Sequence, residues 1–180
     1  MGEPRPAHPV KLFSGLLARA EDVVFLEDQL SEIWGPIDSK SEVFKFSYSK
    51  YYAEELGPEP FRWFVSFKKM IDPESVREYK IQSNDIENKF SLNGLRRFNV
   101  DPGFVDLDKI VLATTKPATY RIYLGKGIYA QSTLYYKAGR FVTWPWTYRD
   151  YQEEKTLLFF KEVRKKFKIE FDQKIGKLHG

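Results

Sequence analysis

The residues best suited to binding or catalysis concentrate between residues 96 and 151. Basic side chains recur there, and two glycines flank a lysine at residues 125–127. Arginine binds phosphate and carboxylate groups through a planar fork of donors, whereas lysine binds them as a point charge. If folding brings these basic residues together, they form an anion site. The residues expected to contact phosphate are Arg97, Lys116, Arg121 and Lys126.

Each of these motifs also has a purely structural interpretation. Gly125-Lys126-Gly127 lacks the spacing of a Walker loop or a dinucleotide fingerprint. It is either a tight β-turn or a turn whose amides and lysine meet a phosphate. Trp144-Pro145-Trp146 either packs a helix onto a sheet or offers Trp146 for stacking on a base or a sugar. The basic residues can equally be separate, solvated surface charges.

An acidic candidate lies in the run Asn99-Val100-Asp101-Pro102-Gly103. The run is typical of a strand that ends in a turn. Asn99 and Asp101 are two residues apart, so on a strand their side chains share a face. Asp101 is therefore the candidate catalytic residue, as a general base or a metal ligand, with Asp106 and Asp108 as further carboxylates. A metal-assisted mechanism requires at least two of these carboxylates to converge on one pocket.

Cysteine is absent from the chain, which excludes disulfides, thiol catalysis, thiolate-bound zinc and iron–sulfur clusters. The two histidines, His8 and His179, lie near opposite ends in segments that we expect to be mobile. Acid–base chemistry therefore falls to Asp, Glu, Lys or Tyr. A metal cofactor would be held by oxygen ligands, which favours magnesium or manganese.

The size and composition of the chain predict a folded protein outside the membrane. The chain has 180 residues, of which 42% are hydrophobic and 17% aromatic, enough for a core. It shows no apolar run of membrane-spanning length and no secretion signal, which predicts a cytoplasmic protein. The formal net charge of +4 is compatible with an anionic partner. Abundant Lys, Glu and Tyr without Cys hints at a thermophilic source.

The pattern of apolar residues predicts a flexible lead-in over residues 1–9 and a single α+β domain over residues 10–180. The expected order is strand, helix, strand, strand, helix, strand, which is the ferredoxin-like pattern. Residues 74–84 are open between helix and edge strand, and a capping box at Asn84 and Glu87 favours a helix over residues 85–91. The later strands extend a mostly antiparallel sheet as hairpins, and a capping box at Thr147 and Asp150 starts a closing helix. The expected strands are residues 10–17, 42–48, 61–70, 97–101, 109–115, 120–124, 128–136 and 140–143, and the first helix spans residues 23–33.

Several segments together resemble a known family. PVKLFSGLL near the start, NVDPG, LATTK, RIYLGKGIYA and PWTY occur in an order that resembles the domain of unknown function 4416 family of bacteria and archaea. The resemblance covers nearly the whole chain. It implies no assigned activity. It also implies an acidic residue just after GIYA, where this chain has Gln131, so a carboxylate metal ligand is missing at that place.

Three functional hypotheses follow. The leading one is a cytoplasmic protein that binds a phosphorylated ligand, such as a nucleotide or RNA, through Arg97, Asn99, Lys116, Arg121, Lys126 and Trp146. The second is a magnesium- or manganese-dependent hydrolase or transferase that uses Asp101. The third is a protein-interaction module. The sequence leaves open the ligand, the oligomeric state and whether the protein is an enzyme.

Overall fold

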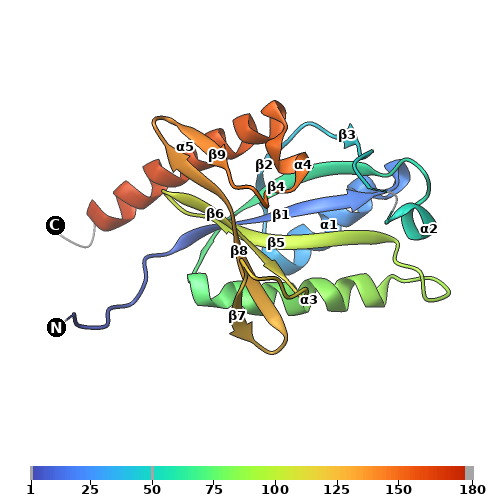
Figure 1. The fold of residues 1–180 in the computed structure, drawn as a ribbon, viewed down its shortest axis with the longest axis horizontal. Helices are drawn as coiled ribbons and strands as arrows, with labels where there is room; N and C mark the ends of the chain where they lie inside the picture. The colour runs from blue at the N-terminus through green and yellow to red at the C-terminus, as the bar shows by residue number, and fades with distance from the viewer. Residues whose placement is uncertain (1, 50, 177–180) are drawn as a thin grey trace.

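The computed structural model describes residues 2–49 and 51–176, except the side chains of residues 175 and 176; His179 lies outside the described residues. The chain forms one antiparallel sheet in the order β2-β4-β1-β5-β6-β8-β7, with β3 paired to β4 and β9 paired to β8 (Figure 1). The strands are β1 (Val10–Ala18), β2 (Ile37–Lys40), β3 (Phe44–Lys45), β4 (Phe61–Ile71), β5 (Phe98–Val105), β6 (Lys109–Thr114), β7 (Ile122–Gly125), β8 (Ile128–Lys137) and β9 (Arg140–Thr143). The α-helices are α1 (Val23–Trp34), α2 (Ala53–Leu56), α3 (Val76–Lys89), α4 (Arg149–Gln152) and α5 (Glu154–Gly176).

The N-terminal half is ferredoxin-like. Its elements run β1-α1-β2-β4-α3-β5, and its strands lie in the order β2-β4-β1-β5 with antiparallel neighbours. This is the split βαβ arrangement, with β3 and α2 inserted before β4. Strands β6 to β9 extend the sheet beyond β5, and α5 closes the chain. The α+β fold class predicted from the sequence is confirmed.

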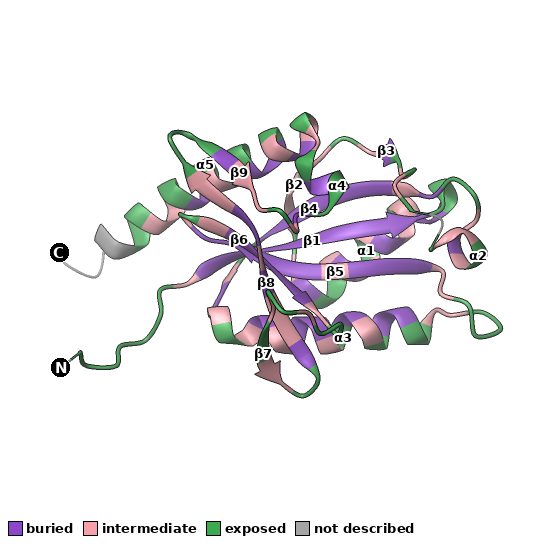
Figure 2. Ribbon diagram, in the orientation of Figure 1, coloured by how far each residue is buried: buried purple, intermediate pink, exposed green. Residues whose placement is uncertain are grey.

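The sheet is covered on both faces, as the alternation along β1 shows. Leu12 and Leu16 belong to a core with α1 and α3, whereas Phe13 belongs to a second core with Tyr151 of α4 and Phe160 of α5. Successive side chains of a strand point to opposite faces, so the two cores lie on opposite sides of the sheet. Because every residue of β1 is buried, this strand is the centre of the molecule (Figure 2).

Several local predictions are wrong. The strand expected at residues 42–48 is reduced to β3, and β2 was not predicted. Residues 76–89 form one continuous helix, so Asn84 and Glu87 lie inside α3 and do not cap it. Thr147 does not cap the helix that follows it either: α4 has Tyr148 at its N-cap and no side-chain cap, and the Thr147 hydroxyl donates to Thr133 O at 2.6 Å instead.

The turn expected at Pro102-Gly103 is also wrong, because both residues lie inside β5. Gly103 is needed there, since a Cβ atom would lie 2.2 Å from Val111 O and 2.6 Å from the Phe13 ring. Pairing between β5 and β6 covers Val105 to Gly103 and stops. Pro102 has no N–H to continue the ladder, so the two strands separate beyond it.

None of the described helices is both long and apolar enough to cross a membrane.

Candidate binding cleft

A cleft of about 370 Å³ lies where β6 separates from β5. Leu17 of β1 and Arg62 of β4 form its floor, because each pairs in register with the strand beside it and shares the face of Asn99. The register also places Asp101 beside Gly15 on that face. Side chains of α3, the segment 46–52, the end of β6 and α4 complete the lining. The cleft therefore continues the α5-covered face past the end of its apolar core.

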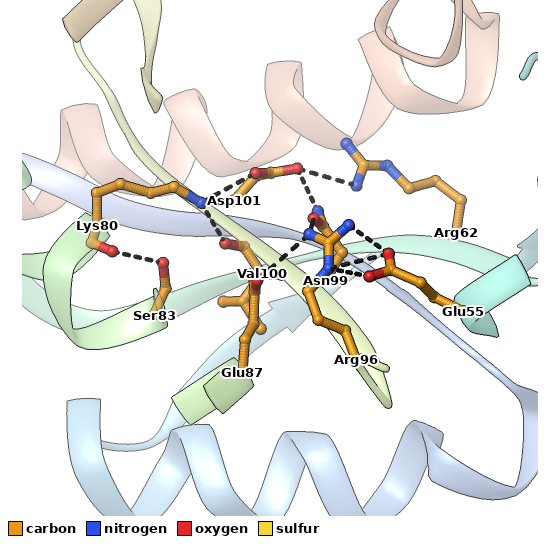
Figure 3. Close-up of polar contacts among 9 residues, drawn as sticks. All are labelled: Glu55, Arg62, Lys80, Ser83, Glu87, Arg96, Asn99, Val100 and Asp101. Atoms are coloured by element: carbon orange, nitrogen blue, oxygen red, sulfur yellow. Dashed lines mark hydrogen bonds and ion pairs between the residues drawn. The ribbon is translucent and has the colours of Figure 1, made fainter. Parts of the chain in front are cut away.

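Two charged residues of α3 replace the missing β6 ladder at Val100 (Figure 3). Lys80 Nζ donates to Val100 O at 2.9 Å, and Val100 N donates to Glu87 Oε1 at 2.7 Å. Both side chains are buried, so they satisfy backbone groups that would otherwise be orphaned. Burial is the main influence on Glu87, and it raises the pKa of that carboxyl.

Asp101 lies at the centre of the polar lining. Its carboxylate accepts from Lys80 Nζ at 3.2 Å and from Asn99 Nδ2 at 2.6 Å, and Arg62 Nη1 lies 3.9 Å away. Burial alone would raise the pKa of Asp101, but Lys80 and Arg62 outweigh it and hold the pKa below its usual value. Asp101 is therefore a carboxylate at neutral pH. It is a weaker general base than a carboxylate with a raised pKa.

Arg96 fixes the outer edge of the cleft. Its Nε donates to Glu55 at 3.0 Å, and its Nη1 donates to Asn99 Oδ1 at 3.0 Å. Glu55 lies in α2, so this contact ties the inserted segment to β5. The hydrogen bond to Arg96 is also the main reason that the pKa of Glu55 is lowered.

Arg62 is the most unusual residue of the cleft. Its side chain is only 6% exposed, and its Nε lies 2.8 Å from Asp150 Oδ2. That contact is an ion pair and not a hydrogen bond, because the Nε–H has no aligned acceptor among the described residues. The guanidinium lies 4.7 Å from the Phe64 ring centroid, in space that Gly15 leaves free: a Cβ on Gly15 would meet Arg62 Nη2 at 2.7 Å.

Tyr151 adds a second unsatisfied group at the floor. The residue is fully buried and lines the cleft, yet its hydroxyl has no hydrogen-bond partner among the described residues. Burial raises the pKa of this hydroxyl well above its usual value, so it stays protonated and can donate. Buried polar atoms without a partner are rare and ask for an explanation. Here both Arg62 and Tyr151 face the same cleft.

The mouth of the cleft is formed by Thr114, Thr115 and Lys116 after β6. Lys116 is exposed, its Nζ lies 4.5 Å from the Tyr51 ring centroid, and it pairs with no carboxylate among the described residues. Arg121 supports this segment: it donates to Lys116 O at 2.7 Å and to the Tyr148 hydroxyl at 2.6 Å. Its third contact is Gln131 Oε1 at 2.9 Å. Gln131 thus orients Arg121, which supports the mouth of the cleft.

The structure brings together only part of the set predicted from the sequence. Asn99, Asp101 and Lys116 line the cleft, and Arg121 stands behind its mouth. Arg97 does not line the cleft and donates to Asp22 at 2.7 Å. The remaining two residues lie elsewhere: Lys126 is 3.4 Å from Glu78, and Trp146 stacks in parallel on Tyr120 and Trp144 at 5.1 and 5.2 Å.

Sequence reasoning missed Arg62, Lys80, Glu87 and Tyr151. A usable signal existed for Arg62, since a charged residue inside an aromatic strand such as FRWFVSF must be paired when that strand is buried. Lys80 and Glu87 are seven residues apart, which places them on one face of a helix. The spacing becomes informative only because residues 76–89 form a helix.

The three candidate aspartates do not gather at one point. Asp106 accepts from His8 at 2.8 Å and lies 2.9 Å from Lys109, in the β5–β6 turn, and Asp108 is exposed beside the same lysine. Asp101 is five residues before Asp106 along β5, about 17 Å at 3.3 Å per residue. Within the described residues, no group of three or more His, Cys, Asp or Glu side chains could hold a metal ion.

Comparison with known proteins identifies a family whose function is unknown. No curated protein and no solved structure matches the chain. The family model described as "Domain of unknown function (DUF4416)" matches residues 8–167. That range contains every residue that lines the cleft. The chain belongs to the DUF4416 family.

Proposed function

We propose that this protein binds a small phosphorylated ligand of the nucleotide class in the cleft between β5 and β6. The observation that carries the proposal is the set of donors without hydrogen-bond acceptors in one cavity. Arg62 and Tyr151 are buried and unsatisfied at the floor, and Lys116 is unpaired at the mouth within the described residues. All three are donors, so the complementary ligand is rich in acceptors, and the unpaired charge of Lys116 favours a ligand that carries negative charge.

The state of the carboxylates in the cleft also favours an anionic ligand. Asp101 and Glu87 already accept hydrogen bonds from Lys80, Asn99 and Val100 N. Their charge is therefore largely compensated inside the protein, whereas the charge of Lys116 is not. An anionic ligand meets the uncompensated charge.

Size and aromatic content favour a small molecule with a ring. A volume of about 370 Å³ lies at the small end of ligand pockets, about 300–1,000 Å³. The lining includes five aromatic side chains, Phe46, Tyr51, Tyr52, Tyr148 and Tyr151. Flat heteroaromatic rings pack well on such surfaces. A nucleotide combines the ring, the acceptors and the charge, and a cavity of this size suits one nucleotide better than a strand of RNA.

Thermal unfolding with a panel of nucleotides and phosphate esters tests the proposal. A ligand at 100 times its dissociation constant should raise the free energy of unfolding by about 2.7 kcal/mol. The Lys116→Gln variant should show a weaker shift than the wild type. Lys126→Gln removes a lysine outside the cleft and serves as the matched control, which should behave like the wild type. The absence of a shift across the panel at low and physiological salt would refute the proposal.

A further inference from the structure

The two ends of the cleft differ in charge. At the floor, Arg62 lies between two carboxylates, with Asp150 at 2.8 Å and Asp101 at 3.9 Å. At the mouth, Lys116 has an aromatic ring as its neighbour and no carboxylate among the described residues. Thr114 and Thr115 add hydroxyl groups beside it. An anionic group and a neutral polar group therefore meet different environments at the two ends.

A phosphate at the floor would lie beside like charges. Asp101 is ionised at neutral pH because Lys80 and Arg62 lower its pKa, and Asp150 pairs directly with Arg62. A phosphate dianion near Arg62 would be repelled by both aspartates in a poorly solvated place. At the mouth the phosphate would meet Lys116 while it keeps part of its hydration.

The floor suits a neutral group that both accepts and donates. Arg62 and the Tyr151 hydroxyl supply donors. The Asp101 carboxylate uses one hydrogen bond on each oxygen, to Lys80 and Asn99, so lone pairs remain for a ligand N–H. The polar edge of every common nucleobase presents donors and acceptors side by side, and such edges are read by paired hydrogen bonds.

We propose that the cleft takes a nucleoside 5′-monophosphate in one orientation, with the phosphate at Lys116 and the base edge at Arg62, Tyr151 and Asp101. This inference rests on the proposed function and adds the direction of binding and the number of phosphates. The Tyr151 ring, whose centroid lies 5.7 Å from the Arg62 guanidinium, favours a flat base over a sugar at this end.

Isothermal titration calorimetry of four proteins tests the orientation: the wild type, Lys116→Gln, Tyr151→Phe and the control Lys126→Gln. The probes are the common nucleosides, their 5′-monophosphates, ribose 5-phosphate and inorganic phosphate. The wild type and Lys126→Gln should bind a monophosphate about tenfold or more tighter than its nucleoside. Lys116→Gln should lose that preference and leave nucleoside binding unchanged. Tyr151→Phe should weaken nucleoside and monophosphate by the same factor, about fivefold.

Different results overturn different statements. If Tyr151→Phe abolishes the preference for the monophosphate and leaves the nucleoside unaffected, the phosphate lies at the floor and the orientation is wrong. If ribose 5-phosphate binds as tightly as the monophosphates, the floor does not read a base. If neither nucleosides nor phosphate compounds bind, the proposed function fails as well. A thermal unfolding curve for each variant shows that it is folded, and Tyr151→Phe changes a single buried atom.

Discussion

The two ends of the β5–β6 pair are built from the same strands and differ in almost every physical respect. At the closed end, Gly103 to Val105 pair with Ile110 to Leu112, and Val105, Ile110 and Leu112 join the apolar core under α5. At the open end, past Pro102, side chains of α3 satisfy the backbone of Val100, and charged groups line a cleft. The contrast shows that a single residue without an N–H can end the pairing of two strands. On one side of it the strands belong to an apolar core, and on the other side they line a cavity.

The largest expected effect is at the open end, with Arg62→Met. The change leaves Asp150 buried without its cation and removes a neighbour of Asp101. Removing one partner of a buried ion pair destabilises a protein by about 3–5 kcal/mol, and urea denaturation measures the loss. Arg140→Met, on the exposed β8–β9 hairpin, should change stability by about 0.5 kcal/mol or less. Equal losses in both variants would mean that Arg62 is not a buried, paired charge.

The closed end should respond most strongly to Gly103→Ala. The added methyl would lie 2.2 Å from Val111 O, a backbone atom, and 2.6 Å from the Phe13 ring. Overpacking of this kind destabilises by about 1–3 kcal/mol, occasionally more. Gly15→Ala is the matched variant, because the three atoms nearest to its methyl all belong to the guanidinium of Arg62 and none to the backbone. We expect Gly15→Ala to impair ligand binding more than Gly103→Ala, and to lower stability less. The reverse order would contradict the distinction between the two ends.

The replacement of the β6 ladder by side chains is tested with Lys80→Met. The variant leaves Val100 O without a partner and removes a cation from Asp101. The loss should lie at the lower end of the about 1–3 kcal/mol expected for an unsatisfied buried group, because Asp101 keeps Asn99 and partial exposure. Amide hydrogen exchange should become faster at Val100 and stay unchanged at Val105. Unchanged exchange at Val100 would show that Lys80 does not hold the open end.

The smallest effect concerns pH. The pKa of Asp101 is lowered by folding from 3.8, so its contribution to stability is present above that value and is lost as pH falls through the folded pKa. Asp101→Asn should therefore flatten the acid side of the stability curve measured by urea denaturation. Asp108→Asn, which removes an exposed carboxylate from the turn at the closed end, is the matched variant for comparison. A wild-type slope in Asp101→Asn would show that the charge of Asp101 is not stabilised.

Much of the fold could be predicted from the sequence, because the main elements carry local signals. The apolar runs of β1 and β4, the three- and four-residue spacing in α1 and the turn at Gly139 each depend on neighbouring residues. Elements that depend on distant partners were missed. The short strand β2 exists only because it pairs with β4, and nothing in IDSK alternates clearly.

The cleft was only partly predictable for the same reason. Asn99 and Asp101 share a face because their spacing on a strand is a local signal, whereas Lys116 was one of several basic residues in the stretch; all three line the cleft. Arg62 and Lys80 come from other parts of the chain. The β1–β4 and β1–β5 registers bring Arg62 to Asp101, and the position of α3 beside β5 brings Lys80 to it. Lys126 does not line the cleft, because basic residues in one stretch of sequence need not meet in space: the turn between β7 and β8 places it beside Glu78.

Pro102 keeps β5 and β6 separated at the cleft whether or not a ligand is bound. The backbone nitrogen of Pro102 carries no hydrogen at any pH or salt concentration. The pairing of β5 with β6 therefore cannot extend through this residue when the cleft is empty. An incoming molecule therefore meets a pre-organised recess and loses little affinity to reshaping the backbone. We expect fast association with little change in the amide spectrum of β5. A Pro102→Val variant supplies the missing N–H and would allow the pairing of β5 and β6 to extend into the cleft.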